Sequence, residues 1–215
     1  MIRAYNKLYL EKAQSCLANM LDYAVTDLHY NLEEFYTLFL SSSVSNLFES
    51  GDCSVIVGKS GIELVYDILL ELNISDVTKL PKPNNRTYRT SIYWTGYSLC
   101  FYQWYTALSF KSINNVVSID TIHSLYFPYH EMDIMQFVDK MNELYKQNRG
   151  YSNLQKIRIA RGITQQQLSY RTTIPLRTIQ NYEQRERNIN KAQAQYIVSL
   201  SKALTCKVED LLELE

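Results

Sequence analysis

The chain has 215 residues and a formal net charge of zero, with 46% hydrophobic and 20% charged residues. This length can bury a substantial core, and the balance of apolar and charged residues excludes a disordered chain. The six glycines and four prolines are fewer than a β-rich fold with many tight turns needs, and they exclude a collagen-like chain. We therefore expect an all-α globular protein.

The cysteines, the N-terminal segment and one uncharged segment indicate the cellular compartment of the protein. The four cysteines, Cys16, Cys53, Cys100 and Cys206, are too far apart for a CxxC unit, so neither a zinc ribbon nor a thioredoxin-type site is predicted. Scattered cysteines and a start without an apolar signal segment predict a cytoplasmic protein. Residues 90–110 carry no charge, but their polar residues and central aromatic rings favour a buried helix over a membrane span.

Residues 1–75 are predicted to form an N-terminal helical bundle. Apolar residues recur at three- and four-residue spacing over residues 8–28, which predicts an amphipathic helix. The segments Asn31–Glu34 and Ser60–Glu63 have the spacing of capping boxes, and each precedes an apolar helical pattern. These helices could bury one another.

The pattern stops at residues 76–89, where prolines and basic residues predict a linker or surface loop. Residues 90–149 follow as an aromatic-rich helical region, either separate or part of one domain with residues 1–75. A helix ending before Pro128 and another over residues 131–147 complete it. A candidate ligand or partner surface consists of aromatic residues at or near helical spacing: Tyr93, Trp94, Tyr97, Phe101 and Trp104. The alternative is that these rings form the core of the region.

The sequence offers little catalytic chemistry. His130, Glu131 and Asp133 lie close together, but acidic residues at a helix start are explained by the helix dipole. The sequence contains no HExxH, GxSxG, P-loop or GxGxxG motif. We therefore predict no catalytic residue, no metal site and no cofactor, and we do not expect an enzyme.

The charge changes sign along the chain. Residues 1–150 contain 12 basic and 16 acidic residues, whereas residues 151–215 contain 10 and 6. A basic module on an acidic body indicates a polyanionic partner for the module, although a solvated basic face is the alternative. Five short helices are predicted in this module: 152–161, 165–171, one beginning near Pro175, one capped by Asn190, and 208–214.

Residues 162–185, GITQQQLSYRTTIPLRTIQNYEQR, predict two helices joined by a tight turn, the second with a polar outer face. This segment resembles the Cro/phage-repressor (XRE-type) helix-turn-helix family without a gap, and the resemblance extends over about residues 153–215. The positions that carry it are Thr164, Gln165, Leu168, Ser169, Ile174, Thr178, Ile179, Tyr182, Glu183, Leu211 and Leu212. One departure is Thr173, where the family often has glycine; a positive φ there would strain threonine.

The resemblance implies a five-helix Cro/C1-type domain, which follows a helical N-terminal region in an all-α chain. It also implies which residues of this domain would contact double-stranded DNA. Base contacts would come from Leu176, Arg177 and Asn181. Phosphate contacts would come from Gln165, Thr178, Arg185, Arg187 and Lys191. Arg158 and Glu183 would form a structural ion pair. The first 150 residues resemble the uncharacterised front half of a group of bacterial XRE-type regulators, which implies no activity.

These observations predict a sequence-specific transcriptional regulator that binds double-stranded DNA as a homodimer. Repression, including autoregulation, is the expected outcome by analogy with the family. The alternative is an antitoxin-like interaction protein whose N-terminal region binds a partner protein, such as a toxin, while the DNA-binding module provides autoregulation. A further alternative is a regulator that responds to a ligand held by the aromatic segment.

Overall fold

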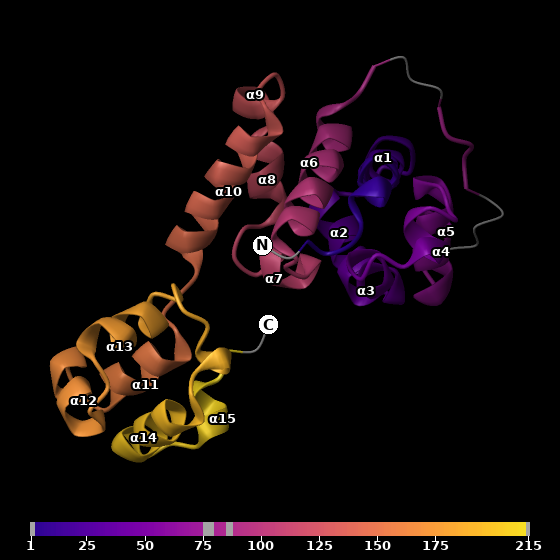
Figure 1. The fold of residues 1–215 in the computed structure, drawn as a ribbon. Coiled ribbons are helices and arrows are strands. Elements are labelled where there is room, and N and C mark those ends of the chain that lie inside the picture. The colour runs from indigo at the N-terminus through magenta and orange to yellow at the C-terminus, as the bar shows by residue number, and fades with distance from the viewer. Residues whose placement is uncertain (1–2, 75–79, 85–87, 214–215) are drawn as a thin grey trace. The chain divides into compact units, whose positions relative to one another are not determined.

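The computed structural model describes residues 3–74, 80–84 and 88–213, and every regular element within these ranges is a helix (Figure 1). The all-α prediction is therefore confirmed. The chain divides into two compact units, Met1–Asn148 and Arg149–Glu215. Within the described ranges, no helix combines the length and the apolar character that crossing a bilayer requires. Of the predicted linker at 76–89, residues 80–84 and 88–89 are not helical, and the rest lies outside the described residues.

The N-terminal unit begins with a 3₁₀ turn, Lys7–Tyr9, which leads into α1, Leu10–Asp22. A π-helical turn, Tyr23–Asp27, extends α1, so the predicted helix over residues 8–28 is one continuous helical path. The other helices of this unit are α2 (Leu32–Ser41), α3 (Ser43–Glu49), α4 (Cys53–Ile56), α5 (Gly61–Glu71), α6 (Ser91–Thr106), α7 (Phe110–Asn114), α8 (Ile119–Ser124), α9 (Tyr126–Tyr129) and α10 (Ile134–Asn148).

Side-chain caps fix where several of these helices begin. The Asn31 side chain accepts hydrogen bonds from the backbone N–H groups of Glu33 and Glu34 at the start of α2. Ser60 and Glu63 form the predicted reciprocal capping box at the start of α5. The helix predicted to end before Pro128 is α8, which ends at Ser124, but Pro128 does not end the helical path, because α9 begins at Tyr126 and contains this proline. Proline is tolerated in the first turn of a helix, where its missing N–H would have no partner.

Helix α1 lies at the centre of the unit and packs most extensively against α6 and then α5. Two glycines permit this close approach. A Cβ atom on Gly61 of α5 would lie 2.4 Å from the Cys16 carbonyl oxygen, and one on Gly96 of α6 would lie 2.8 Å from the Ala18 Cα. Backbone therefore packs against backbone on two sides of α1, and Leu17 between these contacts is fully buried.

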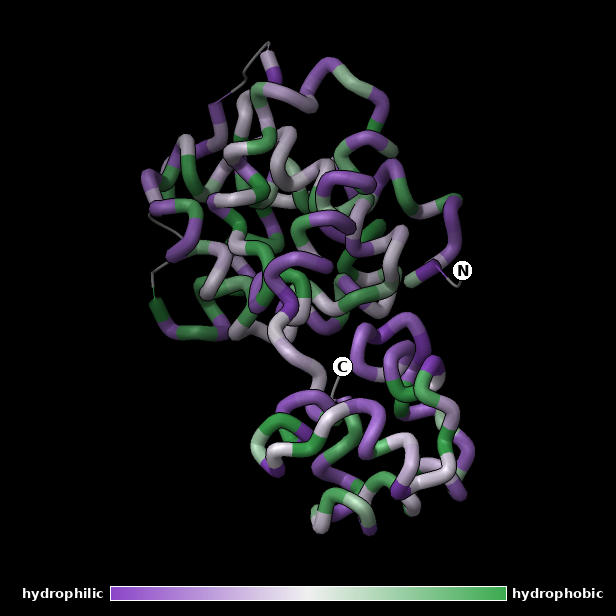
Figure 2. Tube along the Cα trace, turned by 90° about the vertical axis from the view of Figure 1, so that its left-hand side faces the viewer, coloured by the Kyte–Doolittle hydropathy of each residue, from purple (hydrophilic) through white to green (hydrophobic). Residues whose placement is uncertain are grey.

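The C-terminal unit has a core of its own. Its helices are α11 (Asn153–Ala160), α12 (Gln165–Thr172), α13 (Leu176–Glu183), α14 (Ala194–Leu204) and α15 (Val208–Leu211). Leu168, Ile179, Leu200, Leu204 and Leu211 are among the residues that fill the space between them. Hydrophobic residues recur among hydrophilic ones along the helices of both units, as expected for amphipathic helices (Figure 2).

The predicted cap of the fourth helix is wrong. Asn190 lies in a 3₁₀ turn, Ile189–Lys191, and α14 begins later, after Gln193. The Asn190 side chain instead holds the C-terminal segment, because its amide nitrogen donates to the Glu213 carbonyl oxygen and its Oδ1 accepts from the Glu213 backbone N–H.

Candidate nucleic-acid interface

Helices α12 and α13 form the predicted helix-turn-helix. The Thr164 side chain accepts from the Gln167 backbone N–H at 3.1 Å, and the Gln167 side chain accepts from the Thr164 N–H at 2.9 Å, which fixes the start of α12. The turn contains Thr173 at φ +56°, in the left-handed region. The Ser169 hydroxyl donates to the Ile174 carbonyl oxygen at 2.6 Å. This bond and the burial of Ile174 hold the turn although Thr173 is β-branched.

The second helix of the motif, α13, has a buried inner face and an exposed outer face. Its inner face buries Ile179, Tyr182 and Glu183. Arg177 is exposed on the outer face, and the half-buried Leu176 lies beside it in the first turn. Such a face can enter the major groove of DNA and place side chains against base edges.

A buried ion pair fixes α13 to α11. Arg158 Nε lies 2.6 Å from Glu183 Oε1, and Arg158 Nη2 lies 2.9 Å from Glu183 Oε2. Arg158 Nη1 also donates to the Ile163 carbonyl oxygen. The Glu183 side chain is 1% exposed, and its hydrogen bonds raise the pKa of Arg158 above the ordinary value. A bidentate pair at this depth restricts the rotation of α13, so it orients the outer face without touching it.

Gln165 joins this network. Its amide nitrogen donates to Glu183 Oε2 at 2.7 Å, so the side chain faces the ion pair in the free protein. The backbone N–H of Gln165 lies in the first turn of α12, where helix N–H groups lack intrahelical partners. The structure therefore leaves the main chain, more than the Gln165 amide nitrogen, available for the predicted phosphate contact.

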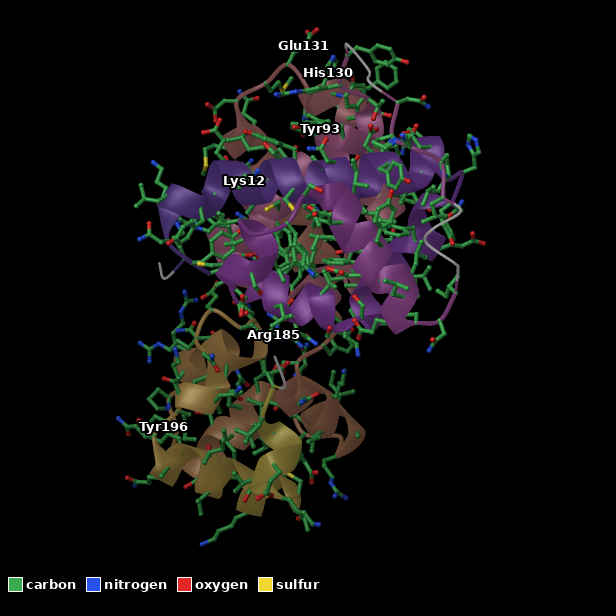
Figure 3. The ribbon with its side chains drawn as sticks, turned by 90° about the vertical axis from the view of Figure 1, so that its right-hand side faces the viewer. Lys12, Tyr93, His130, Glu131, Arg185 and Tyr196 are labelled. Atoms are coloured by element: carbon green, nitrogen blue, oxygen red, sulfur yellow. The ribbon has the colours of Figure 1, made fainter. Side chains whose placement is uncertain are left out.

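Arg185, which was predicted to contact phosphate, forms its hydrogen bonds within the C-terminal unit. Its guanidinium donates to Glu213 Oε2 at 3.0 Å and to the carbonyl oxygens of Gly150, at 2.7 Å, and Tyr151. The predicted phosphate role conflicts with these contacts, because they engage the whole guanidinium within the unit. Arg185, labelled in Figure 3, instead connects the segment that follows α13 to the first and last segments of the unit.

The remaining predicted DNA contacts differ in exposure. Arg187 and Lys191 are exposed, whereas Thr178 is half-buried. The half-buried Asn181 donates from its amide nitrogen to the Arg177 carbonyl oxygen at 3.1 Å and to Glu186 at 3.2 Å. Arg177, Arg187 and Lys191 are therefore the most accessible cations among the predicted contacts.

Sequence reasoning missed two residues that shape this unit. Glu213 accepts from Arg185 and from the Asn153 backbone N–H. Arg161 donates to the carbonyl oxygens of Leu204 and Thr205 and so supports the end of α14. Their partners lie 28 to 60 residues away in the sequence, so no local pattern identifies them.

The five aromatic residues of the second candidate site do not form one surface. Tyr93, Trp94 and Tyr97 line one cavity of the N-terminal unit, but Phe101 and Trp104 do not. Phe101 stacks on Tyr105, and Trp104 is buried, with its indole N–H donating to the Tyr5 carbonyl oxygen at 2.8 Å. In the described part of the chain, no group of three or more His, Cys, Asp and Glu side chains has an arrangement that could hold a metal ion.

Comparison with known proteins agrees with the geometry of the C-terminal unit. Residues 153–215 match the family model of the Cro/C1-type HTH DNA-binding domain. Searches of the curated proteins and of the solved structures gave no significant match. Residues 153–215 are therefore a Cro/C1-type helix-turn-helix DNA-binding domain, of the kind that is typical of DNA-binding transcription regulators.

Proposed function

We propose that this protein regulates transcription by reading a specific sequence of double-stranded DNA through α13. The observation that carries this proposal is the outer face of α13, which presents Arg177 to solvent while the Arg158–Glu183 pair holds the inner face. A guanidinium on a rigidly held helix can make the bidentate contact to guanine O6 and N7 on which much direct readout depends.

Leu176 and Asn181 would complete the base contacts. Leu176 lies beside Arg177 in the first turn and offers an apolar surface to a thymine methyl group. Asn181 lies a turn further along α13, where its amide suits adenine after release from the Arg177 carbonyl oxygen and Glu186. Arg177 carries the larger share, because it is the most exposed of the three.

Phosphate contacts would surround this face. Arg187 and Lys191, both exposed, follow α13 in the chain and would bind the backbone on one side. Thr178 and the backbone N–H of Gln165, at the start of α12, would bind it on the other. Arg185 is left out of this set because its guanidinium is engaged within the unit.

Specific binding by this unit would require two copies. A single helix-turn-helix makes few contacts, so proteins of this type bind as dimers to half-sites about 34–36 Å apart. An inverted repeat in a promoter, including the protein's own, would place the dimer where it blocks transcription. We therefore extend the proposal to a dimeric, autoregulatory repressor.

The test is enrichment of sheared genomic DNA by the full-length protein near physiological salt, compared with Arg177→Ala. We expect inverted-repeat sites that the Arg177→Ala variant no longer enriches. Lys202→Ala, which removes an exposed cation from α14, is the matched control and should retain the same sites. Absence of enriched sites with the folded parent protein, or identical sites with Arg177→Ala, would contradict the proposal.

One observation favours a second function, that of an antitoxin-like interaction protein. Phe127 is 84% exposed on α9, Met132 is exposed just before α10, and Met135 is exposed in the first turn of α10. Exposed apolar side chains gathered on one segment suit contact with a protein. Co-expression with the product of the neighbouring gene tests this alternative; failure to co-purify any partner, while DNA binding persists, would count against it.

A further inference from the structure

A cavity of about 310 Å³ lies in the N-terminal unit, between the start of α6 and the segment that joins α9 to α10. This volume falls at the lower end of the range for small-molecule sites. Figure 3 shows two of its wall residues, Tyr93 and His130, at the same end of the unit. No described residue of the helix-turn-helix unit contributes to the wall, so the cavity is separate from the proposed DNA-binding face.

Aromatic rings from two segments form much of this wall. On α6, the rings of Tyr93 and Tyr97 stack with centroids 6.3 Å apart. Trp94 meets Tyr126 of α9 edge to face at 5.7 Å, and Tyr126 stacks on His130 at 4.4 Å. On its other side Trp94 meets the buried Phe137 at 5.3 Å. The rings are therefore held by one another before any ligand arrives, and such walls suit a flat aromatic molecule.

Ser98 provides an unsatisfied polar group in the same wall. Its side chain is fully buried, and its hydroxyl has no hydrogen-bond partner. Two other hydroxyls of α6 are satisfied by the carbonyl oxygen four residues earlier: Thr95 donates to Ser91 and Thr106 donates to Tyr102. A buried hydroxyl without a partner costs free energy, and a bound polar group would remove that cost.

Arg89 gives the cavity its charge. It is the only Lys, Arg, Asp or Glu among the described residues of the wall. Its guanidinium lies over the Tyr93 ring, 5.0 Å from the centroid, and no hydrogen bond or ion pair is present at this side chain in the described part of the chain. Burial raises the pKa of Tyr97, and Arg89 opposes that rise, which places its positive charge within electrostatic range of the Tyr97 hydroxyl.

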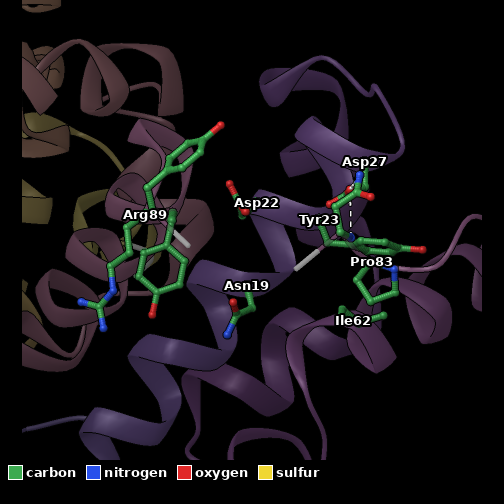
Figure 4. Close-up of a pocket in the computed structure, with 10 residues that line it drawn as sticks. Asn19, Asp22, Tyr23, Asp27, Ile62, Pro83 and Arg89 are labelled. Carbon is green, nitrogen blue, oxygen red and sulfur yellow. Dashed lines mark hydrogen bonds between the residues drawn. The ribbon is translucent and has the colours of Figure 1, made fainter. Parts of the chain in front are cut away.

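A neighbouring cavity of about 610 Å³ shares Arg89 and Tyr93 but has different electrostatics. Its wall contains Asp22 and Asp27, and both carboxylates are already bonded, Asp22 by the Thr90 hydroxyl and Asp27 by the Asn84 amide. Figure 4 shows Asp27 and Pro83 across this second cavity from Arg89. The carboxylates disfavour an anion there, so the charge of Arg89 can serve an anion only on the smaller, aromatic side.

We propose that the smaller cavity binds a small planar aromatic molecule that carries one anionic group. The rings of Tyr93, Trp94, Tyr97 and Tyr126 contact its flat faces and edges, the Arg89 guanidinium binds its anionic group, and the Ser98 hydroxyl donates a hydrogen bond to it. This site is independent of the proposed DNA-binding function, because its residues all belong to the N-terminal unit.

The test uses three probes with the same ring and different charge: benzoate, benzamide and benzylamine. The chain has two tryptophans, Trp94 and Trp104, so a full-length Trp104→Phe variant leaves Trp94 as a reporter in the cavity wall. We expect benzoate to change Trp94 fluorescence in a saturable way, with about tenfold higher affinity than benzamide, and benzylamine to bind more weakly still. If Trp104→Phe fails to fold, calorimetric titration of the parent protein gives the same comparison.

Two variants assign the affinity to the named groups. Arg89→Gln should reduce the benzoate affinity to that of benzamide and leave benzamide unchanged, whereas Lys7→Gln, at an exposed cation outside the cavity, should change neither. Ser98→Ala should weaken benzoate several-fold while thermal unfolding shows an intact fold. Equal affinity for the three probes, an unchanged benzoate affinity in Arg89→Gln, or no saturable response to any probe would overturn the proposal.

Discussion

In residues 149–215 the buried charges are paired, whereas in residues 1–148 several buried polar atoms have no partner within the described ranges. Glu183 accepts two hydrogen bonds from Arg158 and one from Gln165. In the N-terminal unit, the side-chain oxygens of Tyr36, Ser98 and Gln103 are buried and unsatisfied.

The two units therefore differ in what their buried polar groups do. In the C-terminal unit the buried ion pair orients α13, whose outer face is the proposed DNA-binding surface. The N-terminal unit has a large apolar core and keeps unsatisfied polar atoms inside it, one of them in a cavity wall. Function would therefore lie on the surface of one unit and in the interior of the other, and the following substitutions test that difference.

The largest effect is expected for Glu183→Gln, which keeps the shape of the side chain and leaves Arg158 as a buried cation without its counter-charge. Breaking one partner of a buried pair costs about 3–5 kcal/mol. Both tryptophans lie in the N-terminal unit, so urea unfolding followed by fluorescence reports that unit while far-ultraviolet circular dichroism reports both. We expect a dichroism transition at lower urea and an unchanged fluorescence transition.

Two controls accompany this substitution. Glu209→Gln removes an exposed carboxylate from α15 and should leave both transitions in place. The double substitution Arg158→Met with Glu183→Leu should recover much of the lost stability but not the DNA affinity, because apolar packing can replace the pair without reproducing its geometry. Equal, small effects of Glu183→Gln and Glu209→Gln would show that the ion pair does not hold α13.

The substitutions Arg185→Gln and Arg187→Gln compare an arginine that is bonded within the unit with an exposed arginine that we propose contacts DNA. Arg185→Gln should lower the free energy of unfolding of the C-terminal unit by about 1.5–3 kcal/mol, because charged hydrogen bonds to Glu213 and the Gly150 carbonyl oxygen are lost. Arg187→Gln should leave stability unchanged and reduce the slope of log affinity against log salt by about 1. Urea unfolding and DNA titration at several salt concentrations distinguish the two; a reversed pattern would restore Arg185 to the DNA contacts.

The features that the sequence predicted correctly are mostly local. The capping box at Ser60–Glu63 requires only residues three apart, and it is present, whereas at Asn31–Glu34 only the hydrogen bonds to the Asn31 side chain form. The helical periodicity and the scarcity of glycine and proline predicted the all-α class, and the motif between Gly162 and Arg185 predicted the Cro/C1-type domain.

The features that could not be predicted from the sequence depend on contacts between distant segments. Arg185 has a phosphate-contact position in the family pattern, but Glu213 and the Gly150 carbonyl oxygen surround it here. Asn190 has the residue type of a helix cap, but its side chain forms hydrogen bonds with the Glu213 backbone instead. The aromatic residues of α6 divide between a cavity and the core because Tyr126 approaches only some of them.

Gly61→Ala tests the close packing that characterises the N-terminal unit. The added Cβ would lie 2.4 Å from both the Cys16 carbonyl oxygen and the Met20 backbone nitrogen, so α1 and α5 must move apart. Overpacking of this kind costs about 1–3 kcal/mol. We expect the fluorescence-detected transition to move to lower urea. Gly150→Ala, where a Cβ meets nothing within 4 Å, is the matched control and should be neutral; equal effects would contradict backbone-to-backbone packing.

Thr173→Gly is expected to have the smallest effect and the opposite sign. Thr173 has φ +56° in the turn between α12 and α13, and a left-handed conformation costs a non-glycine residue about 1–2 kcal/mol. Glycine removes that cost but adds about 0.5–1 kcal/mol of chain entropy to lose on folding. The net gain should be about 0.5–1 kcal/mol in dichroism-detected unfolding, with unchanged DNA affinity because α13 stays fixed by Glu183.

Thr205, at φ +52° after α14, provides the parallel test outside the helix-turn-helix. Thr205→Gly should raise stability by a similar amount, because the same backbone conformation is relieved. If Thr205→Gly stabilises and Thr173→Gly destabilises, the Thr173 side chain makes contacts that outweigh its backbone strain. The turn would then be held by its threonine, and the absence of glycine at this position would be a specific adaptation of this motif and not a tolerated cost.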